Sequence, residues 1–213
     1  MRPRLDAVLF DLDGTLVDSV ALILESFRFT VGRYGAEVDD AVWLARIGEP
    51  LVEVLAPYAE RFGVAVEDVV ATYREHYVEH HDARTRVFDG VVAALEAVAA
   101  KGVRLGLVSG KSRVGIERTV AFTGLDRFFP VRIGADDCAN GKPNADPLLL
   151  AAERLGVAAG RTAYVGDAPV DVKAAKAARM WSVAVRWGPF SADVIDPLGP
   201  DEVFERVEQI AGL

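Results

Sequence analysis

The chain has 213 residues, of which 51% are hydrophobic, and its formal net charge is −8. This length and composition suit one large domain, or one domain interrupted by an insertion. The negative charge argues against non-specific binding to nucleic acid or to an anionic membrane surface, and no apolar run is long enough to span a bilayer. The single cysteine, Cys138, excludes a disulfide framework within the chain, so we expect a cytoplasmic protein.

Short apolar runs that end in a polar residue or a turn predict five strands. They cover residues 7–10, 104–108, 131–133, 162–165 and 182–185. Helical patterns alternate with the later runs, at 90–101, 112–123, 146–155 and 169–179. The alternation predicts an α/β fold with a Rossmann-like, doubly wound parallel sheet, and the continuously apolar strands predict helices on both of its faces.

Two of these helices carry start signals. Asp146 stands directly before Pro147, which predicts Asp146 as the N-cap and Pro147 as the first helical residue. Pro169 predicts another helix start in the same way. Three glycines follow predicted helix ends, where a left-handed backbone is common: Gly102, Gly124 and Gly156.

The segment 17–86 differs from the rest of the chain because it contains helical patterns and little strand signal. The patterns cover residues 17–34, 39–47, 51–62 and 66–80 and follow the first predicted strand directly. We predict a helical cap at 17–86, inserted into a catalytic core formed by 1–16 and 87–213. Residues 16–18 and 84–88 would be its hinges, and such insertions at strand ends often shape ligand sites.

Charged and polar residues stand where the predicted strands end. Asp11 and Asp13 follow the first strand, Ser109 the second and Asp167 the fourth, while Lys142 lies in a loop before a helix. Ligands bind beyond the carboxyl ends of parallel strands, so these side chains should share one site. Clustered carboxylates repel one another unless a cation neutralises them, and an all-oxygen site suits Mg²⁺. Lys142 would add a positive charge for a phosphate or for the nucleophile.

The stretch DLDGTLVDS, residues 11–19, resembles the first motif of the haloacid dehalogenase superfamily of phosphatases. Within it, the sequence is similar to the branch with a small helical cap, the phosphoglycolate phosphatase-like hydrolases. The other three motifs of that family can also be placed. They are Ser109 in LGLVSGK, Lys142 in GKPNADP, and Asp167 with Asp171 in GDAPVD.

The resemblance implies a mechanism that agrees with these residue types. Asp11 would attack phosphorus and form an aspartyl-phosphate. Asp13 would protonate the leaving oxygen and then activate the water that hydrolyses the intermediate. Mg²⁺ would bind the Asp11 carboxylate, the Asp13 main-chain carbonyl and Asp167.

The resemblance also implies how phosphate would be held. Ser109, the main chain at Gly110 and Lys142 would bind phosphoryl oxygens, and Asp171 would bind the metal through water or orient Lys142. Two positions depart from the family pattern: Gly110 stands where Asn is common, and Ala168 stands where a hydroxyl residue is common. Neither departure removes a residue that is expected to react or to bind metal.

The stretch RIGEPL, residues 46–51, interrupts two helical patterns of the predicted cap and resembles the loop that capped phosphatases point toward the active site. Arg46 would then contact an anionic group of the substrate. The alternative is a surface turn with Arg46 in solvent.

We therefore predict a Mg²⁺-dependent phosphatase that hydrolyses a small phosphorylated metabolite, such as a phosphoglycolate-like phosphomonoester, as a monomer or homodimer. A cap that closes over the site favours a small substrate. The alternatives are a pyrophosphatase or phosphomutase of the same superfamily, or a non-catalytic phosphate-binding regulatory domain. A regulatory domain needs neither Asp13 as an acid nor an inserted cap, and those two features favour an enzyme.

Overall fold

Six parallel strands form the central sheet in the order β5-β4-β1-β6-β7-β8. The computed structural model describes residues 2–213. The strands are β1 (Ala7–Phe10), β4 (Arg104–Val108), β5 (Val131–Ile133), β6 (Thr162–Gly166), β7 (Trp181–Val185) and β8 (Glu202–Phe204). Because β1 is central and later strands extend the sheet on both of its sides, the sheet is doubly wound. The predicted α/β fold is confirmed.

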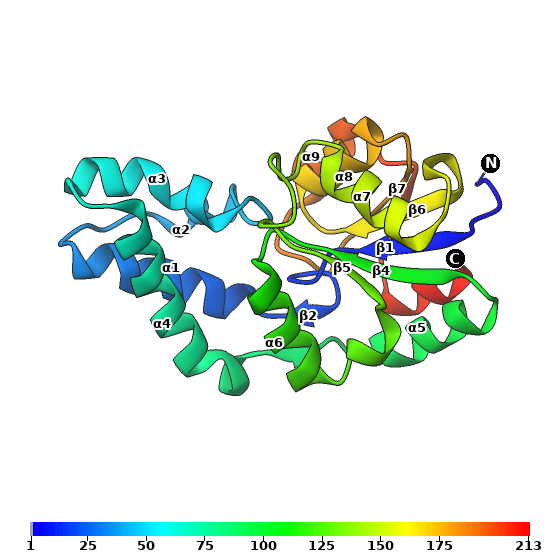
Figure 1. Cartoon of the computed structure of the whole chain (residues 1–213), viewed down its shortest axis with the longest axis horizontal. Helices are drawn as coiled ribbons and strands as arrows, with labels where there is room; N and C mark the ends of the chain where they lie inside the picture. The colour runs from blue at the N-terminus through cyan, green and yellow to red at the C-terminus, as the bar shows by residue number, and fades with distance from the viewer. Residues whose placement is uncertain (1) are drawn as a thin grey trace.

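Helices cover both faces of this sheet (Figure 1). On one face lie α5 (Val91–Ala100) and α6 (Arg113–Thr123), and on the other lie α7 (Asp146–Leu155) and α8 (Pro169–Ala177). The predicted N-cap at Asp146 is wrong by one residue, because Ala145 is the N-cap and Asp146 is already helical. The Asp146 carboxylate instead accepts a hydrogen bond from the Asn140 side chain, 2.8 Å away.

Short helices complete the chain. They are α9 (Ala192–Ile195) and the 3-10 helices η1 (Asp126–Phe128), η2 (Ala159–Arg161), η3 (Asp196–Leu198) and η4 (Val207–Gly212). The last of these, η4, packs against α5, and both chain ends lie at the end of the molecule farthest from α1–α4 (Figure 1). Among residues 2–213, no helix is both long enough and apolar enough to cross a membrane.

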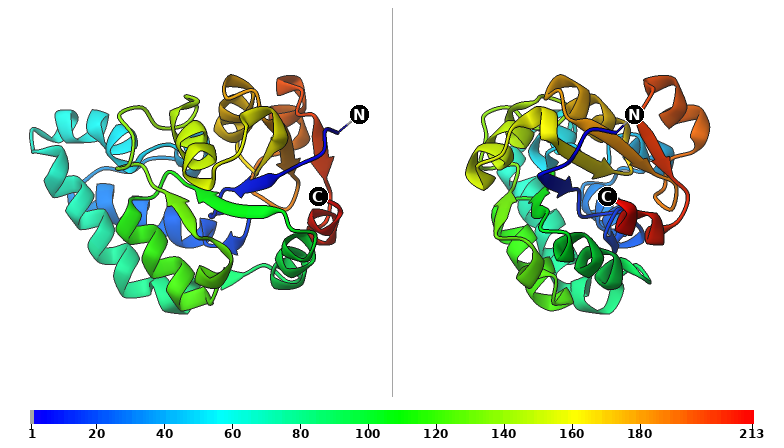
Figure 2. Two further views of the ribbon diagram at one scale, coloured as in Figure 1. Left: turned by 45° about the vertical axis from the view of Figure 1, so that its right-hand side comes forward. Right: turned by 90° about the vertical axis from the view of Figure 1, so that its right-hand side faces the viewer.

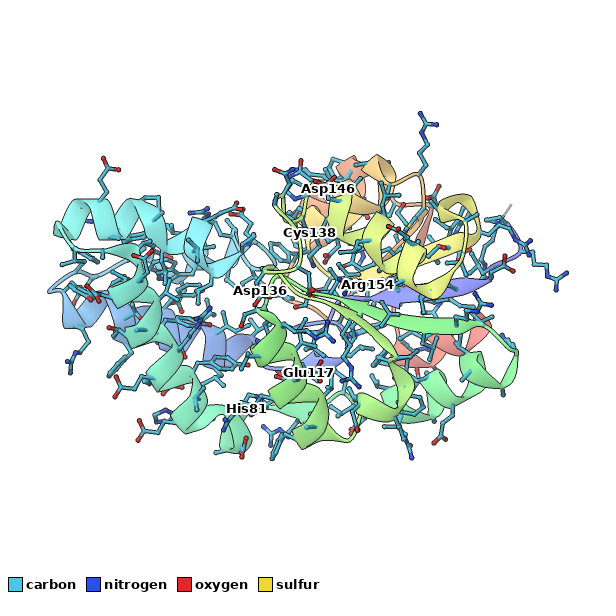
Figure 3. The ribbon with its side chains drawn as sticks, in the orientation of Figure 1. His81, Glu117, Asp136, Cys138, Asp146 and Arg154 are labelled. Atoms are coloured by element: carbon cyan, nitrogen blue, oxygen red, sulfur yellow. The ribbon has the colours of Figure 1, made fainter. Side chains whose placement is uncertain are left out.

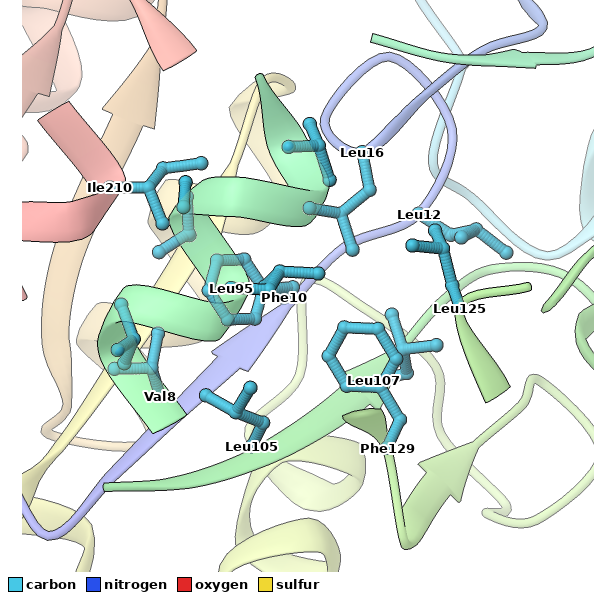
Figure 4. Packing of buried hydrophobic residues seen from close by; sticks show 14 of the residues in the cluster. Val8, Phe10, Leu12, Leu16, Leu95, Leu105, Leu107, Leu125, Phe129 and Ile210 are labelled. Atoms are coloured by element: carbon cyan, nitrogen blue, oxygen red, sulfur yellow. The ribbon is translucent and has the colours of Figure 1, made fainter. Parts of the chain in front are cut away.

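The core lies on both sides of β1. Val8 and Phe10 belong to the cluster on the α5 face, shown in Figure 4, whereas Ala7 and Leu9 belong to the cluster on the α7 face. All four side chains are fully buried, because successive residues of a strand point to opposite faces. This two-sided burial makes β1 a fixed support for the residues that follow it.

The segment after β1 forms a second group of helices, which we term the helical lobe. It consists of α1 (Val20–Arg33), α2 (Asp40–Leu44), α3 (Leu51–Phe62) and α4 (Val66–Arg84). The lobe has an apolar cluster of its own, in which the rings of Phe27 and Trp43 stack with their centroids 4.5 Å apart. The left view in Figure 2 shows these helices at one end of the sheet.

Two short antiparallel strands join the lobe to the sheet, and the sequence did not predict them. In this pair β2 (Val17–Asp18) faces β3 (Arg86–Val87), at the positions predicted as hinges. A second contact joins α4 to α6 where buried His81, labelled in Figure 3, has Nε2 3.0 Å from the Thr119 hydroxyl oxygen. The lobe is therefore held to the core at its base by both backbone and side-chain contacts.

Candidate active site

Three adjacent strands deliver polar residues to one edge of the sheet. Asp11 directly follows β1, Ser109 follows β4 and Asp167 follows β6, and these strands are neighbours in the order β4-β1-β6. All three side chains are buried. The carboxyl ends of parallel strands share an edge, so this register brings together residues that lie far apart in the chain.

Lys142 neutralises part of this buried acidic cluster. Its ammonium donates to Asp11 Oδ1 at 2.9 Å, to Asp171 Oδ1 at 2.6 Å and to the Tyr164 hydroxyl oxygen at 3.0 Å. Burial alone would lower the pKa of Lys142, but the charges of Asp11 and Asp171 raise it well above its usual value. Lys142 is therefore a fixed cation with three partners.

Tyr164 is a member of the site that sequence reasoning missed. From the middle of β6, its hydroxyl donates to the Val108 carbonyl at 2.9 Å and accepts from Lys142. It thereby ties the lysine to the end of β4. The only sequence signal was a polar-tipped aromatic residue in an otherwise aliphatic strand, which is equally typical of a core residue.

Three carboxylates meet beside Lys142: Asp11, Asp167 and Asp171 offer oxygen atoms that lie within 4.8 Å of one another. Burial raises the pKa of Asp11 to about 7, with Lys142 opposing this shift and Asp171 adding to it. Burial, followed by the charges of Asp171 and Asp11, also raises the pKa of Asp167 well above its usual value. One lysine thus leaves excess negative charge in this cluster.

The donor set fits a divalent cation. Asp167 Oδ2 is buried and has no hydrogen-bond partner among residues 2–213, although Thr15 donates to Oδ1 of the same carboxylate at 2.8 Å. Gly14 and Gly188 pack directly against this carboxylate, because a Cβ added to either glycine would collide with it. This carboxylate is thus held in one orientation, and one of its oxygens, near Asp11, has no partner among the described residues. Mg²⁺ sites in proteins use one or two carboxylates of this kind.

Asp171 has a different environment. Its Oδ1 accepts from Lys142, and its Oδ2 accepts from the main-chain N–H of Ala168 at 2.9 Å. Both oxygens are thus engaged by the protein. Of the two expectations for Asp171, this geometry favours the orientation of Lys142. It also gives Ala168 a main-chain contact that does not depend on its side chain.

Asp13 points to another part of the site. One oxygen accepts from the Ser19 hydroxyl, and the other lies 2.8 Å from the ammonium of Lys111. Sequence reasoning did not select Lys111, although it stands only two positions after Ser109. Its ammonium also lies 4.4 Å from the centre of the Tyr77 ring, which belongs to α4 of the helical lobe. Lys111 therefore connects the carboxylate of Asp13 with the lobe.

A cavity of about 120 Å³ lies between the helical lobe and the edge of the sheet. The sheet side of the cavity is lined by Asp11, Asp13, Ser109, Gly110 and Lys111. On the side of the lobe the lining is largely apolar and aromatic, and it includes Ile23, Phe27, Ile47, Val54, Tyr73 and Tyr77. The structure thus brings most of the predicted reacting and phosphate-binding residues to one small cavity.

Arg46 also lines this cavity, but its guanidinium has partners within the lobe. It donates twice to Glu49 Oε2, at 2.9 and 2.7 Å, and also to the main-chain carbonyls of Val54 and Glu53. In this arrangement Arg46 fastens the start of α3 to the preceding loop. Arg46 thus lies at the cavity, as a substrate contact would require, but its charge is already paired with the carboxylate of Glu49.

Comparisons with known proteins agree with this geometry. The family model described as haloacid dehalogenase-like hydrolase matches residues 8–185. The pyrophosphatase PpaX of Halalkalibacterium halodurans is 33% identical in sequence, and the match covers 97% of this chain and 95% of that protein.

Solved structures show the same architecture. A Bacteroides fragilis protein assigned to the haloacid dehalogenase-like hydrolases is 27% identical and superposes with a TM-score of 0.87, covering 97% of this chain and 100% of that one. A Thermotoga maritima protein assigned as a β-phosphoglucomutase is 25% identical, with a TM-score of 0.76 over 98% of this chain and 97% of the other. The similarity therefore includes the helical lobe as well as the sheet.

Proposed function

Because the chain belongs to the haloacid dehalogenase-like hydrolases, we propose that it is an Mg²⁺-dependent phosphatase that acts on a small phosphorylated metabolite. The observation that carries the proposal is the placement of Asp11. Its carboxylate lines the cavity, follows a rigid strand and is held by Lys142. A carboxylate held in one orientation beside phosphate-binding donors favours nucleophilic attack on phosphorus over binding of phosphate alone.

In the first step an oxygen of Asp11 forms a bond to phosphorus, and the bond between phosphorus and the leaving oxygen breaks. Asp13 gives its proton to that leaving oxygen. Ser109, the main chain at Gly110 and Lys142 hold the phosphoryl oxygens while negative charge shifts onto them. The product bound to the protein is an aspartyl-phosphate on Asp11.

In the second step water attacks the phosphorus of that aspartyl-phosphate. Asp13, now deprotonated, accepts a proton from the water, and the Asp11 carboxylate departs. Ser19 and Lys111 hold Asp13 away from the Asp11–Lys142 pair. Two carboxylates separated by two positions can thus perform different functions, because their hydrogen-bond partners differ.

Asp11, Asp167 and the main-chain carbonyl of Asp13 would hold Mg²⁺, while Asp171 positions Lys142. When bound, it offsets the excess charge of the carboxylates and polarises the phosphoryl oxygens. Asp167 contributes an oxygen that has no protein partner. Thr15 fixes the orientation of that carboxylate by donating to its other oxygen.

A second candidate activity is the hydrolysis of pyrophosphate. It is favoured by relatives such as the H. halodurans pyrophosphatase, which matches nearly the whole chain. The Lys111 ammonium lies at the cavity wall, where it would offset the negative charge of a departing phosphate as well as that of a small organic anion. A phosphomutase is a third possibility, supported by the T. maritima structure, and it would have to shield the intermediate from water until the substrate reorients.

A single panel separates these activities. The protein would be incubated with phosphoglycolate, sugar phosphates, nucleotides or pyrophosphate, with and without Mg²⁺, and released phosphate measured. The proposal expects Mg²⁺-dependent release that is lost in Asp11→Asn. Rearranged sugar phosphate without free phosphate would identify a mutase. Turnover by Asp11→Asn at the wild-type rate would overturn the proposal.

A further inference from the structure

We propose that Gly110 and Gly141 form a seat for the loop 48–50 of the helical lobe, and that this seat determines which substrates the site accepts. The inference rests on the proposed phosphatase function. It concerns two glycines that lie on the core side, one after β4 and one directly before Lys142. Neither glycine has a positive φ, so the backbone conformation does not require glycine at these positions.

At Gly110 the obstacle to a side chain is main chain of the lobe. A Cβ placed on Gly110 would lie 2.5 Å from the carbonyl oxygen of Gly48 and 3.0 Å from that of Glu49. Backbone atoms cannot rotate away as a flexible side chain can. Any side chain at this position would therefore displace the loop from its place in this structure.

At Gly141 the obstacle is a ring. A Cβ placed there would lie 2.6 Å from Cγ of Pro50 and 3.3 Å from its Cδ. The Cβ of Pro50 is 4.0 Å away, which is an ordinary van der Waals distance. The absence of a side chain at Gly141 therefore makes room for the proline ring. Alanine would fit at position 141 if residue 50 were smaller than proline.

The loop itself is fitted to the seat. Gly48 has φ +93°, and a Cβ on it would lie 2.8 Å from a methyl carbon of Val170, at the start of α8. Gly48, Glu49 and Gly110 also line the cavity that contains Asp11. Close approach of the loop to the seat thus sets one wall of the cavity that contains Asp11.

This contact explains how size would be selected. A small leaving group lets the loop reach the seat, which encloses the reacting atoms and excludes water. A bulky aryl group holds the loop away from the seat, so its hydrolysis gains less from close contact. A side chain that fills the seat should therefore lower kcat/KM strongly for small substrates and weakly for aryl phosphates.

The test uses four variants of the whole protein: Gly141→Ala, Pro50→Ala, their double mutant and Gly110→Ala. For the best small substrate, Gly141→Ala should lower kcat/KM by about tenfold to a hundredfold, with a much smaller loss for para-nitrophenyl phosphate. Adding Pro50→Ala to Gly141→Ala should restore kcat/KM for the small substrate. Pro50→Ala should not rescue Gly110→Ala, because the obstacles there are main-chain carbonyls. Gly160→Ala, at an exposed glycine with open space around it, is the matched control.

Hydrogen exchange gives a readout that does not depend on activity. Peptides covering 46–51 should exchange faster in Gly141→Ala and Gly110→Ala, and at the wild-type rate in the Pro50→Ala/Gly141→Ala double mutant. Wild-type exchange and unchanged substrate preference in Gly141→Ala would overturn the seat, as would a loss that Pro50→Ala does not reverse. If the wild type releases no phosphate from any substrate, the proposed function fails, while the exchange data still decide whether the seat exists.

Discussion

The ammonium of Lys142 lies 2.9 Å from Oδ1 of Asp11, although 131 positions separate the two residues in the chain. Both side chains are buried, and the same ammonium also contacts Asp171. An ion pair in this environment holds a carboxylate in one orientation while leaving it accessible from the cavity. This pairing has measurable consequences for stability and for activity.

Lys142→Met should destabilise the protein as well as inactivate it. Removal of one partner of a buried ion pair leaves uncompensated charge, which typically costs about 3–5 kcal/mol in unfolding free energy. Urea denaturation would measure the loss, and added Mg²⁺ should recover part of it because the metal offsets the same carboxylates. Lys173→Met, at an exposed lysine on α8, is the control. Equal stability of the two variants would contradict the role given to Lys142.

Asp13→Asn should separate the two chemical steps. A good leaving group needs little protonation, so the variant should still release one equivalent of nitrophenolate from para-nitrophenyl phosphate in a burst. Steady turnover should fall by about a hundredfold or more, because the base for the attacking water is absent. Stopped-flow absorbance would record both phases. Asp18→Asn, at a nearby exposed carboxylate, should behave as wild type, and an Asp13→Asn variant with normal steady turnover would exclude Asp13 as the base.

Asp167→Asn should abolish the stabilisation that Mg²⁺ provides. A ligand present at a hundred times its Kd stabilises a folded protein by about 2.7 kcal/mol. Tm would be measured with EDTA and with increasing Mg²⁺. Wild type should show a saturable rise, and the variant should show little change. A similar rise in both proteins would place the metal elsewhere.

His76 makes the stability of the helical lobe dependent on pH. Its ring stacks on Phe29 and His80, and its Nδ1 lies 3.0 Å from the Ser26 hydroxyl. Burial and then His80 lower the pKa of His76 below its usual 6.5, while Glu25 and Glu79 oppose the shift.

The unfolded chain therefore binds a proton more readily than the folded one does. The resulting stability is complete above pH 6.5 and is lost as the pH falls through the lowered pKa. Tm should thus decline more steeply on acidification in wild type than in His76→Gln. Parallel Tm curves for the two proteins would exclude this histidine as the source.

The features that the sequence predicted best depend on local patterns. Residues 7–10 form a continuous apolar run that ends in DLDG, and β1 has these bounds in the structure. The parallel arrangement followed from strand and helix alternation, so the common location of Asp11, Ser109 and Asp167 could also be foreseen.

Other features depend on contacts between distant residues, which a single sequence does not display. Strand β8 has no distinctive pattern of its own and forms by pairing with β7. Tyr164 resembled an ordinary core aromatic until Lys142 was placed beside it. Lys111 could not be recognised from the sequence, because its environment is formed by Asp13 and by Tyr77 of the helical lobe.

Arg46 illustrates a third case. The loop pattern predicted a position facing the active site. Arg46 lines the cavity, but its side chain is held by Glu49, three residues away, and by carbonyls of α3. Which partner a flexible arginine selects depends on the exact geometry of its surroundings. Its contact with a substrate therefore stays a prediction.

The central claim is that Asp11 carries the phosphoryl group, and peptide mass spectrometry after a rapid acid quench tests it most directly. Asp13→Asn would be mixed with para-nitrophenyl phosphate and Mg²⁺ and quenched within the burst. The account predicts a phosphoryl group on the peptide containing Asp11, located on Asp11 by fragmentation and absent without Mg²⁺. A phosphoryl group on another residue, or a full nitrophenolate burst with no phosphorylated peptide, would contradict it.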